Sequence, residues 1–217
     1  TATTPIRPAT TVEGSSPHHR RASRLRRDLA ACTVDGSLYC VMLGIGESYL
    51  ALFVLAAGFS KVSAGLVTTV PFLLGAILGL LSPVGVRVMK SQRKFIVLCA
   101  AVQSASFVPL VLMAATGRIW LPAVFVAAAL YWGSGMAAGA AWNTWIGLLV
   151  PRRIRTNYFG RRARLCHLAT IIGLAVGGLT LERAAGSGGQ STTWYALLFG
   201  IAGGCRLIST FFLASQT

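Results

Sequence analysis

Residues 119–151 read IWLPAVFVAAALYWGSGMAAGAAWNTWIGLLVP, and this stretch contains no charged side chain. A helix rises about 1.5 Å per residue, so roughly 20 apolar residues cross a hydrocarbon core of about 30 Å. The stretch lacks the alternation of polar and apolar residues that is typical of strands in membrane barrels. Because only helices and closed barrels pair their backbone polar groups in lipid, it predicts a membrane-spanning helix.

Comparable uncharged runs occupy most of the chain. Of its 217 residues, 54% are hydrophobic and 12% are charged. The charged share is about half of that in soluble domains, which excludes a soluble globular enzyme because too few polar side chains remain to cover a water-facing surface. We expect an all-α polytopic membrane domain over 30–217, preceded by a disordered basic tail over 1–29. Its six membrane-spanning helices are expected near 32–57, 63–84, 95–116, 121–147, 165–183 and 193–213.

The net charge of +15 comes from 20 Lys and Arg against 5 Asp and Glu. A basic excess can indicate nucleic acid or an anionic membrane, and the clustering of these cations between apolar runs favours the lipid bilayer and no nucleic acid. The positive-inside rule predicts that the basic side, and with it both termini, is cytoplasmic, in the bacterial plasma (inner) membrane. The clustered cations are Arg7, Arg20, Arg21, Arg24, Arg26 and Arg27 in the tail, Arg87, Lys90, Arg93 and Lys94 after span two, and Arg152, Arg153, Arg155, Arg161, Arg162 and Arg164 after span four.

The five cysteines lie within or beside the apolar runs and show no C-x-x-C spacing. Such residues are typical of small buried hydrophobes, so we expect no disulfide, no metal site and no cofactor. His167 follows Cys166 but has no acidic residue nearby in sequence, and a catalytic pair is not expected. The chain is therefore predicted not to be an enzyme.

Four spans contain glycines four residues apart, which share one helix face and allow helix backbones to approach closely. We expect a tightly packed bundle, with prolines marking kinks or helix ends. The glycine pairs are Gly75 with Gly79, Gly135 with Gly139, Gly173 with Gly177, and Gly200 with Gly204, and the prolines are Pro71, Pro83, Pro109 and Pro122.

Three ionisable residues fall inside expected spans, where burying a charge costs about 2.5–3.5 kcal/mol or more. Counting the helical rise places Asp35 and Arg206 at similar depth, so they either form an ion pair or extend separately to the headgroups. Glu47 lies deeper, with no basic residue at its level. It is a candidate for proton coupling or substrate binding, and the alternative is a hydrogen-bonded polar residue that packs span one.

Span four carries a polar and aromatic face. Trp132, Gly139 and Asn143 share one helical stripe, and Tyr131 lies on the neighbouring stripe. Aromatic residues of membrane helices often mark the interface. Tyr131 and Trp132 lie closer to the middle of the span, where they can line a cavity.

Two motifs and the topology resemble the major facilitator superfamily of secondary transporters. The family has G-x-x-x-D-R-x-G-R-R/K after span two, and GVRVMKSQRK at 85–94 matches at Gly85, Arg93 and Lys94, with Lys90 for the Arg. Met89 replaces the motif Asp, and Gln92 replaces the second Gly. After span four, LVP at 149–151 followed by Arg155 is similar to the family's L-V-P-x-x-x-R-G, with Thr156 in place of the Gly. Six spans with internal termini match the family's N-terminal half, as in an uncharacterised bacterial subgroup.

The resemblance implies a 3+3 repeat bundle that alternates between inward- and outward-facing states. Spans one and four of that fold line the central path, so Glu47, Tyr131 and Trp132 would face it, and Asn143 is included as a candidate for the substrate or proton pathway. Arg206 would be a supporting residue. The cytoplasmic gating loops would contain Gly85, Lys90, Arg93, Lys94, Pro151 and Arg155.

A full transporter of this family has two six-helix halves, which implies a missing C-terminal half or a second copy as partner. The expected cargo is a small molecule, with protons as the coupling ion, and the residues do not define its identity. The alternative function is a non-transporting six-helix scaffold or assembly partner.

Overall fold

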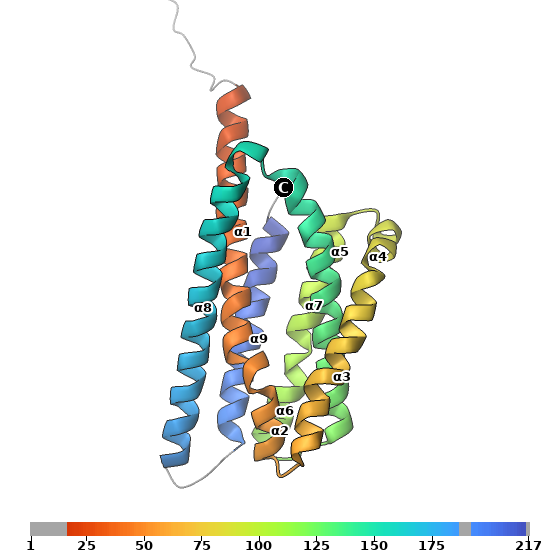
Figure 1. Cartoon of the computed structure of the whole chain (residues 1–217), viewed down its shortest axis with the longest axis vertical. Coiled ribbons are helices and arrows are strands. Elements are labelled where there is room, and N and C mark those ends of the chain that lie inside the picture. The colour runs from red at the N-terminus through yellow and green to blue at the C-terminus, as the bar shows by residue number, and fades with distance from the viewer. Residues whose placement is uncertain (1–16, 187–191, 216–217) are drawn as a thin grey trace, which may run out of the picture.

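The computed structural model describes residues 17–186 and 192–215, which are almost entirely helical and include no strand (Figure 1). Six helical segments in these ranges are long and apolar enough to cross a membrane, and the chain is an integral membrane protein. The six predicted spans are thereby confirmed. The segments are Arg26–Ala56, Lys61–Leu80, Gln92–Thr116, Leu121–Gly147, Arg152–Gly186 and Thr193–Ser215.

Several spans consist of more than one helix. Span one contains α1 (Pro17–Ile45), the 3-10 helix η1 (Glu47–Tyr49) and α2 (Leu50–Ala56). Span two is α3 (Lys61–Leu80), which is followed by the short α4 (Ser82–Met89), and span three is divided into α5 (Gln92–Ala105) and α6 (Phe107–Thr116). Spans four, five and six are α7 (Leu121–Leu149), α8 (Arg152–Gly186) and α9 (Thr193–Ser215).

Two helices begin earlier than the sequence predicted. α1 begins at Pro17, so the expectation of a disordered tail is wrong for 17–29, and residues 1–16 lie outside the described part. α8 begins at Arg152, so the arginine-rich stretch 152–164 is helical and not a loop. Hydropathy does not detect such extensions, because arginine favours helix although it is not apolar.

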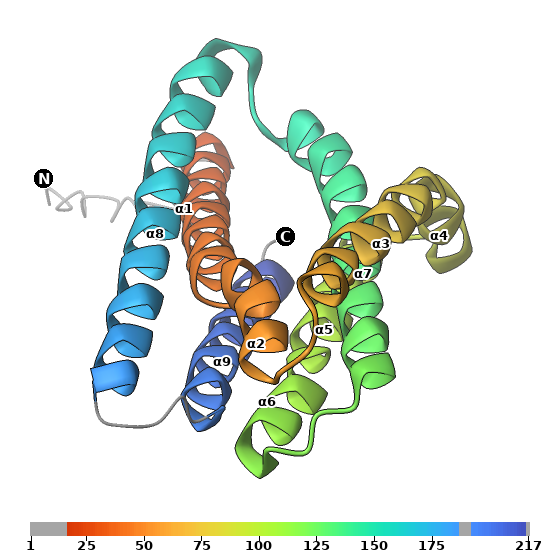
Figure 2. The same cartoon turned by 60° about the horizontal axis from the view of Figure 1, so that its bottom comes forward.

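The helices do not pack in chain order, although α2 at the end of span one also contacts α3. Span one lies between spans five and six, and span four lies between spans two and three, while α5 and α6 of span three contact α9 of span six. Figure 2 shows the resulting order α8, α1, α9, then α5 and α6, then α7 and α3. The start of α1, the end of α9, and the α4–α5 and α7–α8 connections all lie at one end of the bundle (Figure 1).

Glycines set the closest helix approaches. A Cβ on Gly173 of α8 would lie 2.9 Å from the Val41 carbonyl oxygen and 3.1 Å from Cα of Gly44, both in α1. A Cβ on Gly75 of α3 would lie 2.8 Å from the backbone of Trp132 in α7. The expectation of close packing is therefore confirmed in spans two and five. It is wrong for Gly139, Gly200 and Gly204, which have no neighbour within 4 Å of an added Cβ.

Two spans are interrupted within their length. In span three, Pro109 has no N–H to donate to the Ala105 carbonyl, and α5 ends at Ala105. The break in span one contains no proline: α1 ends at Ile45, and the Ser48 hydroxyl donates to the Leu43 carbonyl at 3.0 Å. This second break places Glu47 where the regular backbone hydrogen bonding of span one is interrupted.

Candidate functional site

Glu47 and Tyr131, predicted separately, meet between spans one and four. The Tyr131 hydroxyl donates to Oε2 of Glu47 at 2.6 Å, and Tyr131 is only 4% exposed. The Tyr131 ring packs edge-on against Phe107 and Trp132, with centroids 5.5 and 5.4 Å apart. The aromatic packing fixes the hydroxyl, so the carboxylate is held at the helix break by a group from another span.

The other two predicted pathway residues do not contact the Glu47 carboxylate through any hydrogen bond of the described residues. Trp132 packs edge-on against Phe72 at 4.9 Å and over the backbone at Gly75, so it contacts α3. Asn143 is exposed on α7. Like Glu47 and Tyr131, these two residues line neither of the two cavities described below.

Asp35 and Arg206 also come together. Their side chains are 4.0 Å apart, and each residue is only 5% exposed. Ser209 bridges them, because its hydroxyl donates to Asp35 Oδ1 at 2.5 Å and accepts from Arg206 Nη1 at 3.0 Å. The Arg206 guanidinium lies 4.8 Å from the centre of the Tyr39 ring. The structure therefore places this pair inside the protein and not at the headgroups.

A cavity of about 440 Å³ opens beside this ion pair. Its lining comes from α1, α5, α7, α8 and α9, and its ionisable side chains include two arginines, one aspartate and one histidine among the described residues. The guanidinium of Arg162 stacks 4.4 Å from the centre of the Trp142 ring, and its Nε donates to the Cys32 carbonyl at 3.4 Å. The polar and aromatic lining residues used below are Asp35, Tyr39, Trp142, Arg162, His167 and Arg206.

Sequence reasoning missed Arg162 and Trp142 as lining residues of a cavity. Arg162 was assigned to a loop because span five was expected to begin at 165. The buried face of α8 carries Cys166, Ala169 and Gly173, and the same helical spacing continued toward the N-terminus arrives at Arg162. That periodicity could have identified it once residues 152–164 were recognised as helical.

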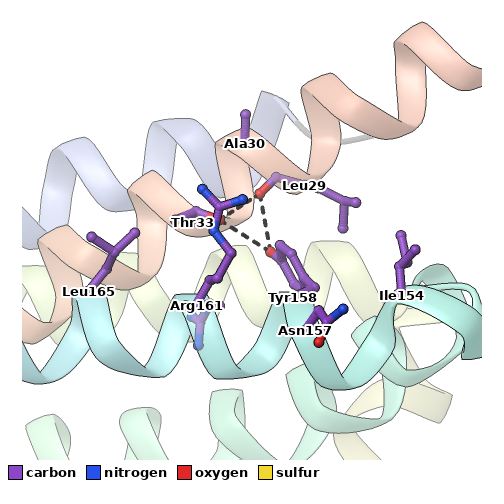
Figure 3. A pocket seen from close by; sticks show the side chains of 9 residues that line it. Leu29, Ala30, Thr33, Ile154, Asn157, Tyr158, Arg161 and Leu165 are labelled. Atoms are coloured by element: carbon purple, nitrogen blue, oxygen red, sulfur yellow. Dashed lines mark hydrogen bonds between the residues drawn. The ribbon is translucent and has the colours of Figure 1, made fainter.

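A second cavity of about 360 Å³ lies between α1 and α8, near the arginine-rich start of α8 (Figure 3). The hydroxyls of Tyr158 and Thr33 both donate to the Leu29 carbonyl, at 3.1 and 2.9 Å. Figure 3 shows these side chains between the two helices, with Arg161 beside them. The Tyr158 bond fastens the first part of α1 to α8, and so it also supports the position of Arg162, one helical turn further along α8.

The residues predicted for gating loops mostly cap helices. Arg93 donates from Nη2 to the Ala214 carbonyl of α9 at 2.6 Å, and Arg155 donates to the carbonyls of Gly147 and Val150 at the end of α7. The last carbonyls of a helix have no partner within it, so each arginine satisfies acceptors inside this bundle. The backbone N–H of Lys94 donates to the hydroxyl of Ser91, the N-cap of α5, at 3.3 Å.

Of two further residues of this group, Gly85 differs from the prediction and Pro151 lies in a connection as expected. Gly85 lies inside α4 and not in a loop, and its backbone packs against the Phe95 ring. The reason is that Pro83 starts a new helix immediately after α3, where the hydropathy pattern marked only the end of a span. Pro151 is exposed between α7 and α8.

Lys90 ends α4 in the left-handed region, with φ 52° and ψ 20°. This conformation costs a residue with a Cβ about 1–2 kcal/mol and costs glycine little. We expect Lys90→Gly to raise the free energy of unfolding by roughly 0.5–1 kcal/mol, measured by SDS titration in mixed micelles. Lys94→Gly, in the regular first turn of α5, should lower it, and equal effects at the two sites would contradict the backbone argument.

The fold defines a helical integral membrane protein with six candidate membrane spans. Comparison of the chain with protein-family models, with curated proteins and with solved structures finds no match. Among the described residues, no group of three or more His, Cys, Asp or Glu side chains could hold a metal ion. The features that bear on function are therefore the two side-chain pairs and the cavity.

Proposed function

We propose that the chain is one six-helix lobe of a secondary active transporter of the major facilitator type, and that it couples transport of a small molecule to protons. The observation that carries this proposal is the carboxylate of Glu47, held at the break of span one by Tyr131 of span four. Membrane transporters build ion and substrate sites at such interrupted helices. A carboxylate accepts the tyrosine hydrogen bond when ionised and can donate one when protonated, so the pair can exchange a proton.

The order of helix packing supports a 3+3 arrangement. Suppose that spans one, two and three are exchanged with spans four, five and six, respectively. The observed contact between spans one and five then becomes a contact between spans four and two, which is also observed. In the same way, the contact between spans one and six becomes the observed contact between spans four and three. The contact between spans three and six is unchanged by the exchange. Two inverted three-helix repeats are the arrangement proposed for each half of this transporter family.

The basic connections support an inward orientation of both ends. The α4–α5 and α7–α8 connections and the described ends of the chain share one end of the bundle (Figure 1). Arginine and lysine cluster there, which by the positive-inside rule favours the cytoplasmic side of a bacterial plasma membrane. A second six-helix lobe, encoded with this chain or supplied by another copy, completes the proposed alternating pathway.

Glu47→Gln tests the coupling role. In vesicles loaded with a pH-sensitive dye and challenged with a panel of organic acids, amines and sugars, we expect at least a tenfold loss of compound-driven proton movement, because the amide cannot carry the proton. Glu182→Gln, at an exposed position of α8, is the matched control and should change the rate by less than twofold. The sample reconstituted in the vesicles is the full gene product, which includes a second six-helix lobe if the gene encodes one.

The result that would contradict this proposal is proton movement that survives Glu47→Gln at the wild-type rate. A complete lack of compound-driven flux in the wild-type protein, with association to membrane partners unchanged by Glu47→Gln, would favour the scaffold.

A further inference from the structure

We infer that the 440 Å³ cavity beside the Asp35–Arg206 pair binds a small organic carboxylate through Arg162, Trp142 and Arg206. The inference deepens the proposed function and rests on it in one respect: the bound carboxylate is then the transported substrate. The site itself follows from charge, hydrogen-bond donors and space in the cavity.

The charge of the lining is positive. Asp35 is the acidic residue among the described lining residues, and it already accepts from Ser209 and pairs with Arg206. Arg162 has no ion pair of its own among the described residues: its Nε makes a long bond of 3.4 Å to the Cys32 carbonyl, its guanidinium packs against the backbone at Gly36, and it interacts with the Cys32 thiol and, over a longer range, with Asp35. The guanidinium of Arg162 therefore lies at the cavity without a carboxylate of its own. Its unpaired positive charge attracts an anion rather than an amine.

Two buried donors at the cavity have no acceptor. Nε1 of Trp142 and Nε of Arg206 are buried and make no hydrogen bond to a described residue. Leaving a buried polar group unpaired costs about 1–3 kcal/mol, and both groups are N–H donors that cannot accept. The other unpaired buried atoms in the described ranges belong to Gln103, Trp132 and Arg155, which do not line this cavity. Both nitrogens are closed to water in this conformation, so a ligand that brings acceptor oxygens pairs them only when the two side chains shift toward the cavity.

Stacking orients the two guanidinium groups. Arg162 lies over Trp142 at 4.4 Å, and Arg206 lies over Tyr39 at 4.8 Å. Guanidinium groups that stack by their faces keep their N–H donors at the edge, where a carboxylate can bind with two parallel hydrogen bonds. Arginine thus has a geometric advantage over lysine at this position.

The size of the cavity limits the anion. A volume of about 440 Å³ lies within the range of roughly 300–1,000 Å³ that is typical of small-molecule sites. Gly135, Ala138 and Gly139 form part of the wall on α7 and leave room for an apolar body. A carboxylate that crosses together with one proton carries no net charge, which is consistent with a separate proton site at Glu47.

The test measures equilibrium binding to the full protein in phosphatidylcholine nanodiscs, by calorimetry and tryptophan fluorescence. The probes are acetate, benzoate and glutarate, each compared with its neutral amide, and benzylammonium as the cation. We expect at least one carboxylate to bind ten times more tightly than its amide. Arg162→Gln should weaken that binding roughly tenfold to a hundredfold, because a charge-assisted hydrogen-bond pair is lost.

The matched control is Arg164→Gln, which removes an exposed arginine of the same helix that does not line the cavity, and it should change binding by less than twofold. Arg162→Lys should give an intermediate loss, because the charge remains and the two-point geometry does not. The carboxylate that binds should also raise the unfolding temperature of the wild-type protein, and this shift should disappear in Arg162→Gln.

Carboxylates that bind no better than their amides would overturn the inference, as would equal losses in Arg162→Gln and Arg164→Gln. The binding experiment tests the site separately from the proposed transport function, because binding is measured at equilibrium without a proton gradient. Carboxylate binding without proton movement contradicts the transporter and keeps the site. Proton movement driven only by amines or sugars contradicts the site and keeps the transporter.

Discussion

Gly173→Leu is expected to lower the free energy of unfolding by about 3 kcal/mol or more and to leave little folded protein in membranes. Even a Cβ at this position would lie 2.9 Å from the Val41 carbonyl oxygen, which is tighter than ordinary contact. The obstacle is backbone of α1 and not a flexible side chain, so the two helices must separate. Their separation would also remove α8, with Arg162, from the cavity.

Gly200→Leu provides the control, because Gly200 is an exposed glycine of α9 with no neighbour within 4 Å of an added Cβ. It should leave the stability unchanged or raise it slightly, since glycine is a poor helix former. SDS titration in mixed micelles, followed by tryptophan fluorescence, measures both variants. Similar losses at Gly173 and Gly200 would show that the α1–α8 contact is not the cause.

The spans could be predicted because hydropathy sums over some 20 residues, and no single residue decides it. The ends of helices that lie in charged sequence could not be predicted, because an arginine-rich helix outside the apolar run has the low hydropathy of a loop. Residues 152–164 are an example. The break at Pro109 follows from one missing N–H. The break before Glu47 contains no proline, and there Gly46 packs closely against Ala202 and Phe107 of other spans.

The candidate site was predictable in parts for a related reason. Depth, counted along each helix, indicated that Asp35 and Arg206 could meet. Rotation about the helix axis is decided by neighbouring helices, and Trp132 accordingly packs on α3 whereas Trp142, further along the same helix, lines the cavity. Predicting the Glu47–Tyr131 contact requires the depth of both residues in the membrane and the rotation of both helices about their axes. The sequence therefore indicated each residue as a candidate but not that the two form a hydrogen bond.

Asp35→Asn is expected to lower the free energy of unfolding by about 3–5 kcal/mol, because it leaves Arg206 charged and buried without its partner. Both side chains are 7% exposed in the pair, so little water is in contact with the guanidinium to replace the lost carboxylate in the folded state. Ser209 can still donate to the amide oxygen of an asparagine, so the hydrogen bond is retained while the charge is lost. The effect measured is therefore mainly that of the unpaired guanidinium.

A double-mutant cycle separates this pairing from a simple packing defect. Arg206→Met should recover most of the stability lost in Asp35→Asn, because the double variant has neither charge and keeps a side chain that fills space. Losses that add in the double variant would show that the two residues act independently. The proposed carboxylate site predicts a further property of Asp35→Asn. In this variant Asp35 is replaced by a neutral side chain, so N–H donors of Arg206 become free to bind the ligand. A bound carboxylate should therefore raise the unfolding temperature more in Asp35→Asn than in the wild type. An equal or smaller rise would place the anion away from Arg206.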